Sequence, residues 1–103
     1  MSDKRKEQGD SAVREREKID KPRRYKVVLL NDHYTTMEFV VKVLREVFHH
    51  SPAQSTRIML HIHNHGVGIA GVYSKEVAET RIARAEEMAK EHGHPLQCDM
   101  EPE

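Results

Sequence analysis

A short apolar run over residues 25–30 stops abruptly at a polar turn, and this transition constrains the fold more than any other feature of the chain. The run is rich in valine and leucine and begins with a tyrosine, which predicts a central β-strand. Residues 31–33 then place an amide, a carboxylate and an imidazole in succession, and apolar residues return at helical spacing. The chain must therefore pass from a buried strand into an amphipathic helix through a junction that carries polar groups.

The start of this first helix has a recognisable capping pattern. Thr35 is predicted as the N-cap, Glu38 completes a capping box, and Tyr34 and Phe39 occupy the positions of a hydrophobic staple. The apolar residues that follow at helical spacing predict a stripe facing the core, and its members are Met37, Val40, Val41, Leu44, Val47 and Phe48.

A second helix is predicted between Ser51 and Gly66. Ser51 is a typical N-cap, Pro52 suits the first helical position, and Gln54 stands at the capping-box position. Gly66 follows the last helical residues and predicts a left-handed C-cap.

The rest of the chain predicts a strand, a helix and a last strand. Residues 67–73 form an apolar run with glycines that permit close packing, and Ser74 is predicted to cap a third helix. Gly93 and Pro95 end that helix, and residues 96–100 predict a short strand. The order βααβαβ indicates an α+β domain in which a three-stranded sheet packs against three helices.

Charge divides the 103-residue chain into two parts, although its formal net charge is zero. The first 24 residues hold nine basic and six acidic side chains, and the remainder holds eight basic and eleven acidic ones. Few apolar residues occur before Pro22, so residues 1–22 are predicted to be a disordered, flexible extension and residues 23–103 the folded domain.

Composition also narrows the partners and the compartment. The extension mixes both signs of charge without aromatic residues, which argues against nucleic acid as a partner. No apolar run is long enough to span a bilayer, and the N-terminus lacks the apolar segment of a secretory signal. The single cysteine, Cys98, excludes an internal disulfide and fits a reducing compartment, so we expect a cytoplasmic location.

The sequence contains no nucleophile elbow, Walker A loop or HExxH motif, and we expect no catalytic activity and no cofactor. Two other interpretations remain open. His61 and His65 are spaced as metal ligands on one helical face, and with His63 they could make a His-rich metal-binding regulatory domain. Asp32 and His63 could instead act as an acid–base pair.

The polar groups of the junction suit a different task, which is to hold a protonated α-amino group. Such a cation has three hydrogen-bond donors, and Asn31, Asp32 and His63 offer an amide oxygen, a carboxylate and an imidazole nitrogen. Hydrogen bonds to a charged group contribute roughly 1.5–3 kcal/mol each, and an engulfed apolar side chain contributes about as much. After the cost of association, the total fits binding on the order of micromolar.

The chain also resembles the ClpS family, bacterial adaptors that deliver N-degron substrates to the ClpA–ClpP protease. The resemblance extends over about residues 22–101. It rests on the motifs Asn31-Asp32-His33-Tyr34-Thr35-Thr36-Met37-Glu38-Phe39-Val40, His61-Ile62-His63, Gly71-Val72-Tyr73, Glu76-Val77-Ala78-Glu79-Thr80 and His94-Pro95-Leu96-Gln97-Cys98.

This resemblance implies roles for individual residues. Asn31, Asp32 and His63 match the groups that hold the substrate's α-amino group. Met37 matches a gatekeeper whose bulk excludes β-branched side chains, and the implied substrates begin with phenylalanine, tyrosine, tryptophan or leucine. The implied side-chain pocket consists of Thr35, Met37, Val40, Met59, Ile62 and Leu96.

The chain departs from the family pattern at two positions of the junction. His33 stands where most members carry a second aspartate, and Thr36 stands where they carry a proline. His33 remains a possible contact at the pocket mouth, and losing a carboxylate there should weaken the negative potential that a basic second residue would meet.

The resemblance further implies two partners and two more surfaces. N-degron peptides and proteins would be bound by the pocket, and a ClpA-type AAA+ ATPase would receive them. The flexible extension would be needed for delivery, and residues 76–84, with His63 nearby, would dock the ATPase.

Overall fold

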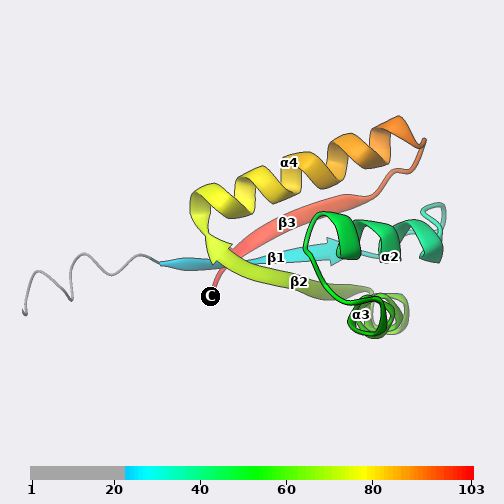
Figure 1. Ribbon diagram of the computed structural model, residues 1–103, viewed down its shortest axis with the longest axis horizontal. Helices are drawn as coiled ribbons and strands as arrows, with labels where there is room; N and C mark the ends of the chain where they lie inside the picture. The colour runs from blue at the N-terminus through cyan, green and yellow to red at the C-terminus, as the bar shows by residue number, and fades with distance from the viewer. Residues whose placement is uncertain (1–22) are drawn as a thin grey trace, which may run out of the picture.

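The secondary-structure elements follow one another in the order βααβαβ, which confirms the predicted α+β class (Figure 1). The structure, a computed structural model, describes residues 23–103, and the predicted extension over residues 1–22 lies outside the described part. The elements are β1 (Arg24–Leu30), α2 (Met37–Glu46), α3 (Pro52–His65), β2 (Val67–Ser74), α4 (Lys75–Glu91) and β3 (Gln97–Pro102).

The first strand, β1, is the centre of a three-stranded antiparallel sheet whose order is β2-β1-β3. Its pairing with β2 shifts register between Val27 and Val28, where Ala70 forms a bulge. The Ala70 carbonyl accepts a hydrogen bond from the His50 Nε2 at 2.6 Å, so the loop after α2 is tied to this bulge. Helix α4 packs along the sheet, and α2 and α3 gather where β1 ends (Figure 1).

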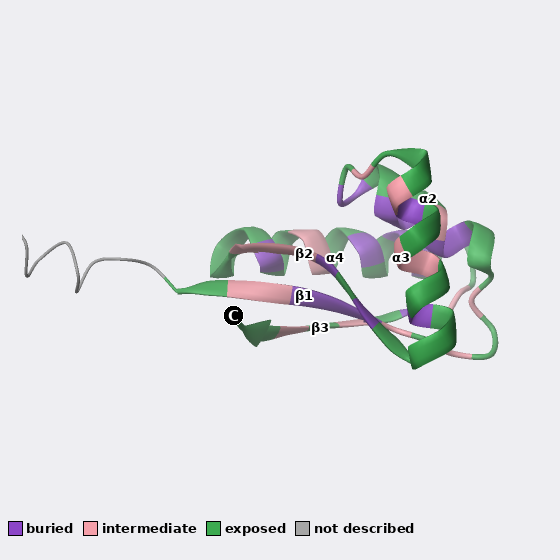
Figure 2. Cartoon of the chain, turned by 90° about the horizontal axis from the view of Figure 1, so that it is seen from below, coloured by how far each residue is buried: buried purple, intermediate pink, exposed green. Residues whose placement is uncertain are grey.

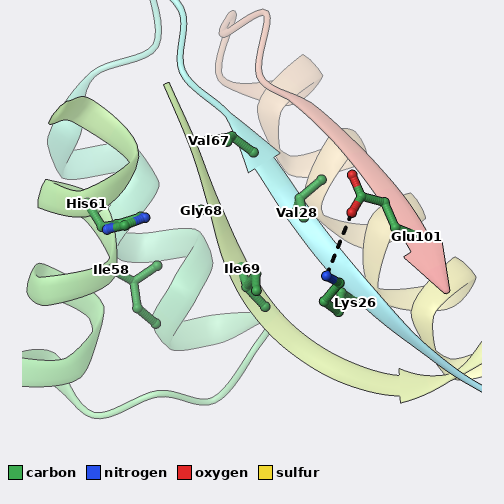
Figure 3. Close-up of a pocket in the computed structure, with 8 residues that line it drawn as sticks. All are labelled: Lys26, Val28, Ile58, His61, Val67, Gly68, Ile69 and Glu101. Carbon is green, nitrogen blue, oxygen red and sulfur yellow. Dashed lines mark ion pairs between the residues drawn. The ribbon is translucent and has the colours of Figure 1, made fainter. Parts of the chain in front are cut away.

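The two faces of β1 serve different environments. Val27 and Leu29 are fully buried in the core, whereas Val28 lies in a surface groove beside Ile58 of α3 and Ile69 of β2 (Figure 3). We call this depression the α3–β2 groove, and its lining residues are Lys26, Val28, Ile58, His61, Val67, Gly68, Ile69 and Glu101.

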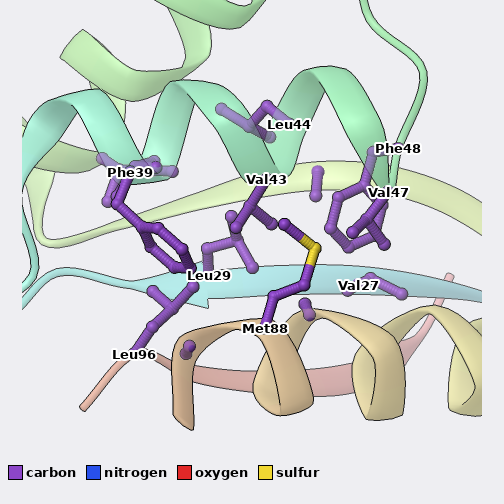
Figure 4. Packing of buried hydrophobic residues seen from close by; sticks show 14 of the residues in the cluster. Val27, Leu29, Phe39, Val43, Leu44, Val47, Phe48, Met88 and Leu96 are labelled. Atoms are coloured by element: carbon purple, nitrogen blue, oxygen red, sulfur yellow. The ribbon is translucent and has the colours of Figure 1, made fainter. Parts of the chain in front are cut away.

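The core lies between α2, the sheet and α4. Leu29 of β1, Val43 and Leu44 of α2, and Met88 of α4 meet there, and all are buried (Figure 4). Figure 2 shows the buried residues in the second half of β1 and along one side of α2 and α4. Sheet and helices therefore share one hydrophobic core.

Three of the predicted helix caps are confirmed. The Ser51 side chain accepts a hydrogen bond from the Gln54 N–H, and Ser74 accepts one from the Val77 N–H. Gly66 adopts the left-handed conformation (φ 89°) that ends α3, and its N–H donates to the Ile62 carbonyl. These serines and this glycine act through local geometry, which is why the sequence alone predicts them.

The predicted N-cap of the first helix is wrong by one residue. Thr36, not Thr35, has the extended conformation of an N-cap and accepts a hydrogen bond from the Phe39 N–H at 3.1 Å. The Thr35 backbone and hydroxyl are instead bound by Asp32, so the helix begins only at Met37.

The predicted core stripe of this helix is also partly wrong. Phe39 and Val43, which are not part of the predicted stripe, are buried, whereas Met37 is 46% exposed and Val41 is half-buried. Met37 is the first residue of α2, and its side chain is left partly exposed at that end of the helix.

The last strand begins one residue later and ends two residues later than predicted, since Leu96 precedes β3 and is buried in the core. In the described part of the chain, no helix is long and apolar enough to cross a membrane.

Candidate functional site

A cavity of about 330 Å³ lies between the turn that follows β1, the start of α2 and the second half of α3. We call it the turn cavity. Its size is at the lower end of the range for ligand pockets. Its lining residues are Asn31, Asp32, His33, Tyr34, Thr35, Thr36, Met37, Val40, Met59, Ile62 and His63.

The Asp32 carboxylate organises the turn that forms one wall of the turn cavity. Its Oδ1 accepts hydrogen bonds from the N–H groups of Tyr34, at 2.8 Å, and Thr35, at 2.6 Å. Its Oδ2 accepts one from the Thr35 hydroxyl at 2.7 Å. A carboxylate has about four lone-pair sites, so at least one remains for a further donor.

These hydrogen bonds also keep Asp32 charged. Partial burial by itself raises the pKa of Asp32, but the bonds from Thr35 and Tyr34 and the neighbouring His33 outweigh it and hold the pKa below its ordinary value of 3.8. A carboxylate that is both ionised and fixed in orientation is suited to receive a cation.

A single backbone hydrogen bond joins the turn to α3. The Asn31 N–H donates to the Gly66 carbonyl at 2.9 Å, at the residue that ends the helix. This contact brings Asn31 and Asp32 to the same cavity as Ile62 and His63, which lie in the last turn of α3. The left-handed conformation of Gly66 thus helps to build the site.

The apolar floor of the cavity comes from both helices. Ile62 is 2% exposed, Val40 is 8% exposed, and Met59 is half-buried. Ile62 lies against the backbone of β2 at Gly68, where an added Cβ would come within 2.6 Å of the Ile62 side chain. Gly68 therefore permits the close approach of α3 to the sheet that fixes this floor.

The mouth of the cavity is polar and open. His33 and His63 are exposed, and Tyr34 is 79% exposed. Met37, nearly half exposed, is an apolar side chain at the same opening. The cavity combines a buried apolar floor with a charged and solvated rim.

The structure brings most of the predicted site residues together in the turn cavity, including His33 at its mouth. Leu96 is the exception, because it does not line the cavity and packs in the core. Tyr34 and Thr36 line the cavity but are not among the predicted site residues. The sequence does hold one signal for them, because both stand between predicted site residues. However, a helix-cap pattern explains the same two residues without any binding role.

The three alternating histidines of α3 are divided between two sides of the helix. His63 lines the turn cavity, whereas His61 lines the α3–β2 groove, and the rings of His61 and His65 stack with centroids 4.2 Å apart. Within residues 23–103, no three histidine, cysteine or acidic side chains come together as metal ligands. The predicted three-histidine arrangement is therefore not formed.

The only cysteine is not poised for nucleophilic chemistry. Burial, together with the charge of Glu86, raises the pKa of Cys98 to about 12. The thiol therefore stays protonated near neutral pH, and thiolates are the reactive form.

A second surface depression lies at the start of α4. It is lined by Glu76, Val77, Thr80 and Arg81, and Val77 is 40% exposed there. Arg81 is held from behind, because it donates to the Val47 carbonyl at 2.6 Å. The depression thus combines an exposed apolar side chain with polar groups on a fixed helix.

Comparison with known proteins points to one family. Residues 20–99 match the sequence model of the ATP-dependent Clp protease adaptor protein ClpS. The chain is 56% identical over 95 residues to the ATP-dependent Clp protease adapter protein ClpS of Desulfatibacillum aliphaticivorans, covering 92% of this chain and 91% of that protein. It is 58% identical over 84 residues to the ClpS of Phenylobacterium zucineum, covering 82% and 77%.

A solved structure has the same fold. The structure of Agrobacterium tumefaciens ClpS2 bound to L-phenylalaninamide is similar to this chain with a TM-score of 0.78 and 42% sequence identity. The similarity covers 81% of this chain and all of that one.

Proposed function

The chain belongs to the ClpS family of ATP-dependent Clp protease adaptors, and on that premise we propose that it binds proteins through a free, bulky apolar amino-terminal residue and delivers them to a ClpA-type ATPase. The preferred first residues are phenylalanine, tyrosine, tryptophan and leucine. The protein itself is an adaptor and cuts no peptide bond. Its work with an ATP-dependent protease would take place in the cytoplasm.

One observation carries this proposal: an ionised and oriented carboxylate, Asp32, stands at the rim of a cavity with an apolar floor. In the proposed complex the α-amino group of the substrate donates to Asp32, to the Asn31 side-chain oxygen and to a neutral imidazole nitrogen of His63. Three acceptors match the three donors of a primary ammonium group. A peptide bond or an acetylated terminus cannot satisfy them.

The first side chain of the substrate enters the apolar part of the turn cavity. Val40 and Ile62 form its floor, and Met59 and Met37 adapt to flat or branched guests. Thr35 holds Asp32 at the boundary between the polar rim and the pocket. We assign Leu96 to the core behind this region and not to the pocket wall.

The solved relative supports this division of labour. L-Phenylalaninamide, the molecule bound to Agrobacterium tumefaciens ClpS2, has a free α-amino group and a phenyl side chain. These are the two chemical features that the turn cavity of this chain is equipped to meet.

The proposal is tested by fluorescence anisotropy with labelled peptides that begin with phenylalanine, leucine, tyrosine, tryptophan, isoleucine or methionine. Each peptide is measured with a free and with an acetylated amino terminus. We expect micromolar or tighter binding of the free aromatic and leucine peptides, weak binding of isoleucine and loss of binding on acetylation. Equal binding of free and acetylated peptides would refute recognition of the α-amino group.

Delivery is a second step with its own surface. We assign ATPase docking to the start of α4, around Glu76, Val77 and Arg81, where an apolar side chain is exposed beside charged groups. Deletion of residues 1–20 should leave peptide binding intact but abolish degradation of an N-degron substrate by ClpA and ClpP. A truncated protein that still accelerates degradation would show that delivery does not require the extension.

A further inference from the structure

Two histidines on the outer side of α3 form a close pair. His61 and His65 are one helical turn apart, both are exposed, and their rings stack with an interplanar angle of 18° and centroids 4.2 Å apart. Residues four apart on a helix lie on the same face, which is the spacing at which two imidazoles can share one metal ion. Because the stacked ring planes are nearly parallel, their in-plane lone pairs do not meet at one point, and a shared ion requires one of the exposed rings to rotate. The pair lies on the other side of the helix from the turn cavity, which contains His63.

The tautomer of His65 is set by the backbone. Its Nδ1 lies 3.1 Å from the His61 carbonyl oxygen. Because a carbonyl can only accept, Nδ1 must carry the proton and donate, which leaves the lone pair of Nε2 free. Metal-binding histidines commonly donate their second ring N–H to a backbone carbonyl in this way.

The His61 ring is supported by the neighbouring strand. Its Cδ2 edge lies against the backbone of β2 at Gly68, and Figure 3 shows the ring reaching from α3 toward that glycine. A side chain at position 68 would meet this ring, so the bare backbone of Gly68 leaves it room. The His65 ring is thus oriented by a hydrogen bond, so the exposed His61 ring is the one that must rotate for the two lone pairs to converge.

We propose that His61 and His65 form a two-histidine site for a divalent transition-metal ion of the copper, nickel or zinc class. Imidazole nitrogens suit these ions, and the pair offers none of the oxygen ligands that magnesium and calcium prefer. In the described part of the chain no third ligand joins them. The remaining coordination positions are therefore open to water or to a group from a bound partner.

The site has a structural consequence. A metal ion across His61 and His65 would clamp the last turn of α3, whose intervening residues Ile62 and His63 line the turn cavity. The ion would stabilise the folded helix by mass action, because the unfolded chain does not hold the two rings together. This inference stands on the histidine pair and does not depend on the proposed adaptor function.

The test is isothermal titration calorimetry of the full-length, untagged protein with copper(II), nickel(II) and zinc(II) salts, each alone. We expect saturable binding of one ion, tighter for copper than for nickel or zinc, and a rise in Tm on addition of metal. His61→Ala and His65→Ala should each weaken binding by about tenfold or more, which is the smallest loss expected when even an outer partner of a ligand is removed.

The matched control is His49→Asn, which removes another exposed histidine at a position with positive φ that asparagine tolerates. This variant should bind metal like the unaltered protein. As a second readout, bound copper(II) should selectively broaden the NMR signals of residues 61–65. Unchanged affinity in both alanine variants, or an equal loss in the His49→Asn variant, would overturn the assignment.

Discussion

Two hollows flank the same helix, and only one of them is suited to recognise a charged terminus. The turn cavity takes Met59, Ile62 and His63 from α3, whereas the α3–β2 groove takes Ile58 and His61. Both have apolar walls. They differ in their charged groups, because Asp32 at the turn cavity is fixed by hydrogen bonds from its own turn and forms no ion pair with a basic side chain within residues 23–103.

In the α3–β2 groove, the two oppositely charged side chains form an ion pair with each other. Lys26 Nζ lies 3.9 Å from Glu101 Oε1 on the neighbouring strand, so the ion pair leaves little net charge for a ligand. If the proposed function holds, apolar volume by itself does not define a site for an amino terminus. An oriented anion with a vacant lone pair must stand at its edge.

Removing the charge at the turn cavity should have the largest effect. Asp32→Asn keeps the shape and a carbonyl oxygen for the turn but loses the charge that would face the ammonium group of the proposed substrate. Since a hydrogen bond to a charged group contributes roughly 1.5–3 kcal/mol, peptide affinity should fall by about 10- to 100-fold. Anisotropy with a free phenylalanine peptide measures this loss. If the Asp32→Asn variant bound the peptide as tightly as the original protein, the charge of Asp32 would not be what distinguishes the turn cavity from the α3–β2 groove.

Shortening the apolar side chain at the mouth should change selectivity more than affinity. Met37→Ala should admit isoleucine peptides and reduce the preference for phenylalanine over isoleucine by about tenfold, the discrimination that a few methylene groups can provide. The matched control is Leu60→Ala, because Leu60 is 45% exposed, close to the 46% of Met37, and lines neither hollow. The same selectivity change in the Leu60→Ala variant would contradict a gate at Met37.

A second carboxylate at the rim should sharpen the contrast further. His33→Asp should tighten binding of peptides with a basic second residue by about fivefold at most, because the new pair would be exposed to solvent. Peptides with an alanine at that position provide the control and should change less. Equal or weaker binding of the basic peptides would show that His33 does not set the potential of the rim.

The pH dependence of stability should also report on Asp32. Its pKa in the folded protein lies below the unfolded value, so its contribution to stability is present above the unfolded pKa and is lost as the pH falls through the folded pKa. Urea unfolding of the original and the Asp32→Asn proteins should therefore differ at neutral pH and converge in acid. A difference that stays constant down to low pH would exclude this linkage.

The smallest effect is expected in the groove. Ile69→Ser changes an exposed side chain, 47% accessible, so the free energy of unfolding should change by about 0.5 kcal/mol or less and affinity for a phenylalanine peptide should stay the same. Loss of peptide binding would mean that peptides also bind in the α3–β2 groove. An oriented charge would then not be what sets the turn cavity apart.

The sequence predicts those features of the fold that depend on neighbouring residues. The caps at Ser51, Gly66 and Ser74 are confirmed because each acts on backbone groups within three or four residues. The order of strands and helices is confirmed for the same reason, since hydrophobic periodicity is a local signal. These elements bring the turn and α3 into position.

What the sequence misses depends on side chains that reach across a turn or between elements. Thr35 loses its capping role because Asp32 binds it, and Met37, at the first position of the helix, is left partly outside the core. Periodicity says that an apolar residue faces inward but not whether it also borders a cavity, which is why it does not separate Leu96, packed only in the core, from Ile62, which lines the turn cavity as well.

The hydrogen bond from Asn31 to Gly66 makes the site dependent on a long-range contact. It continues the β1–β2 pairing one step beyond Leu30 and Val67, so it requires two segments that are far apart in the sequence to meet. A chain that has folded only its local helices would have no assembled turn cavity. Peptide affinity would then measure whether the tertiary structure is complete. An incompletely folded molecule would bind its proposed substrates poorly.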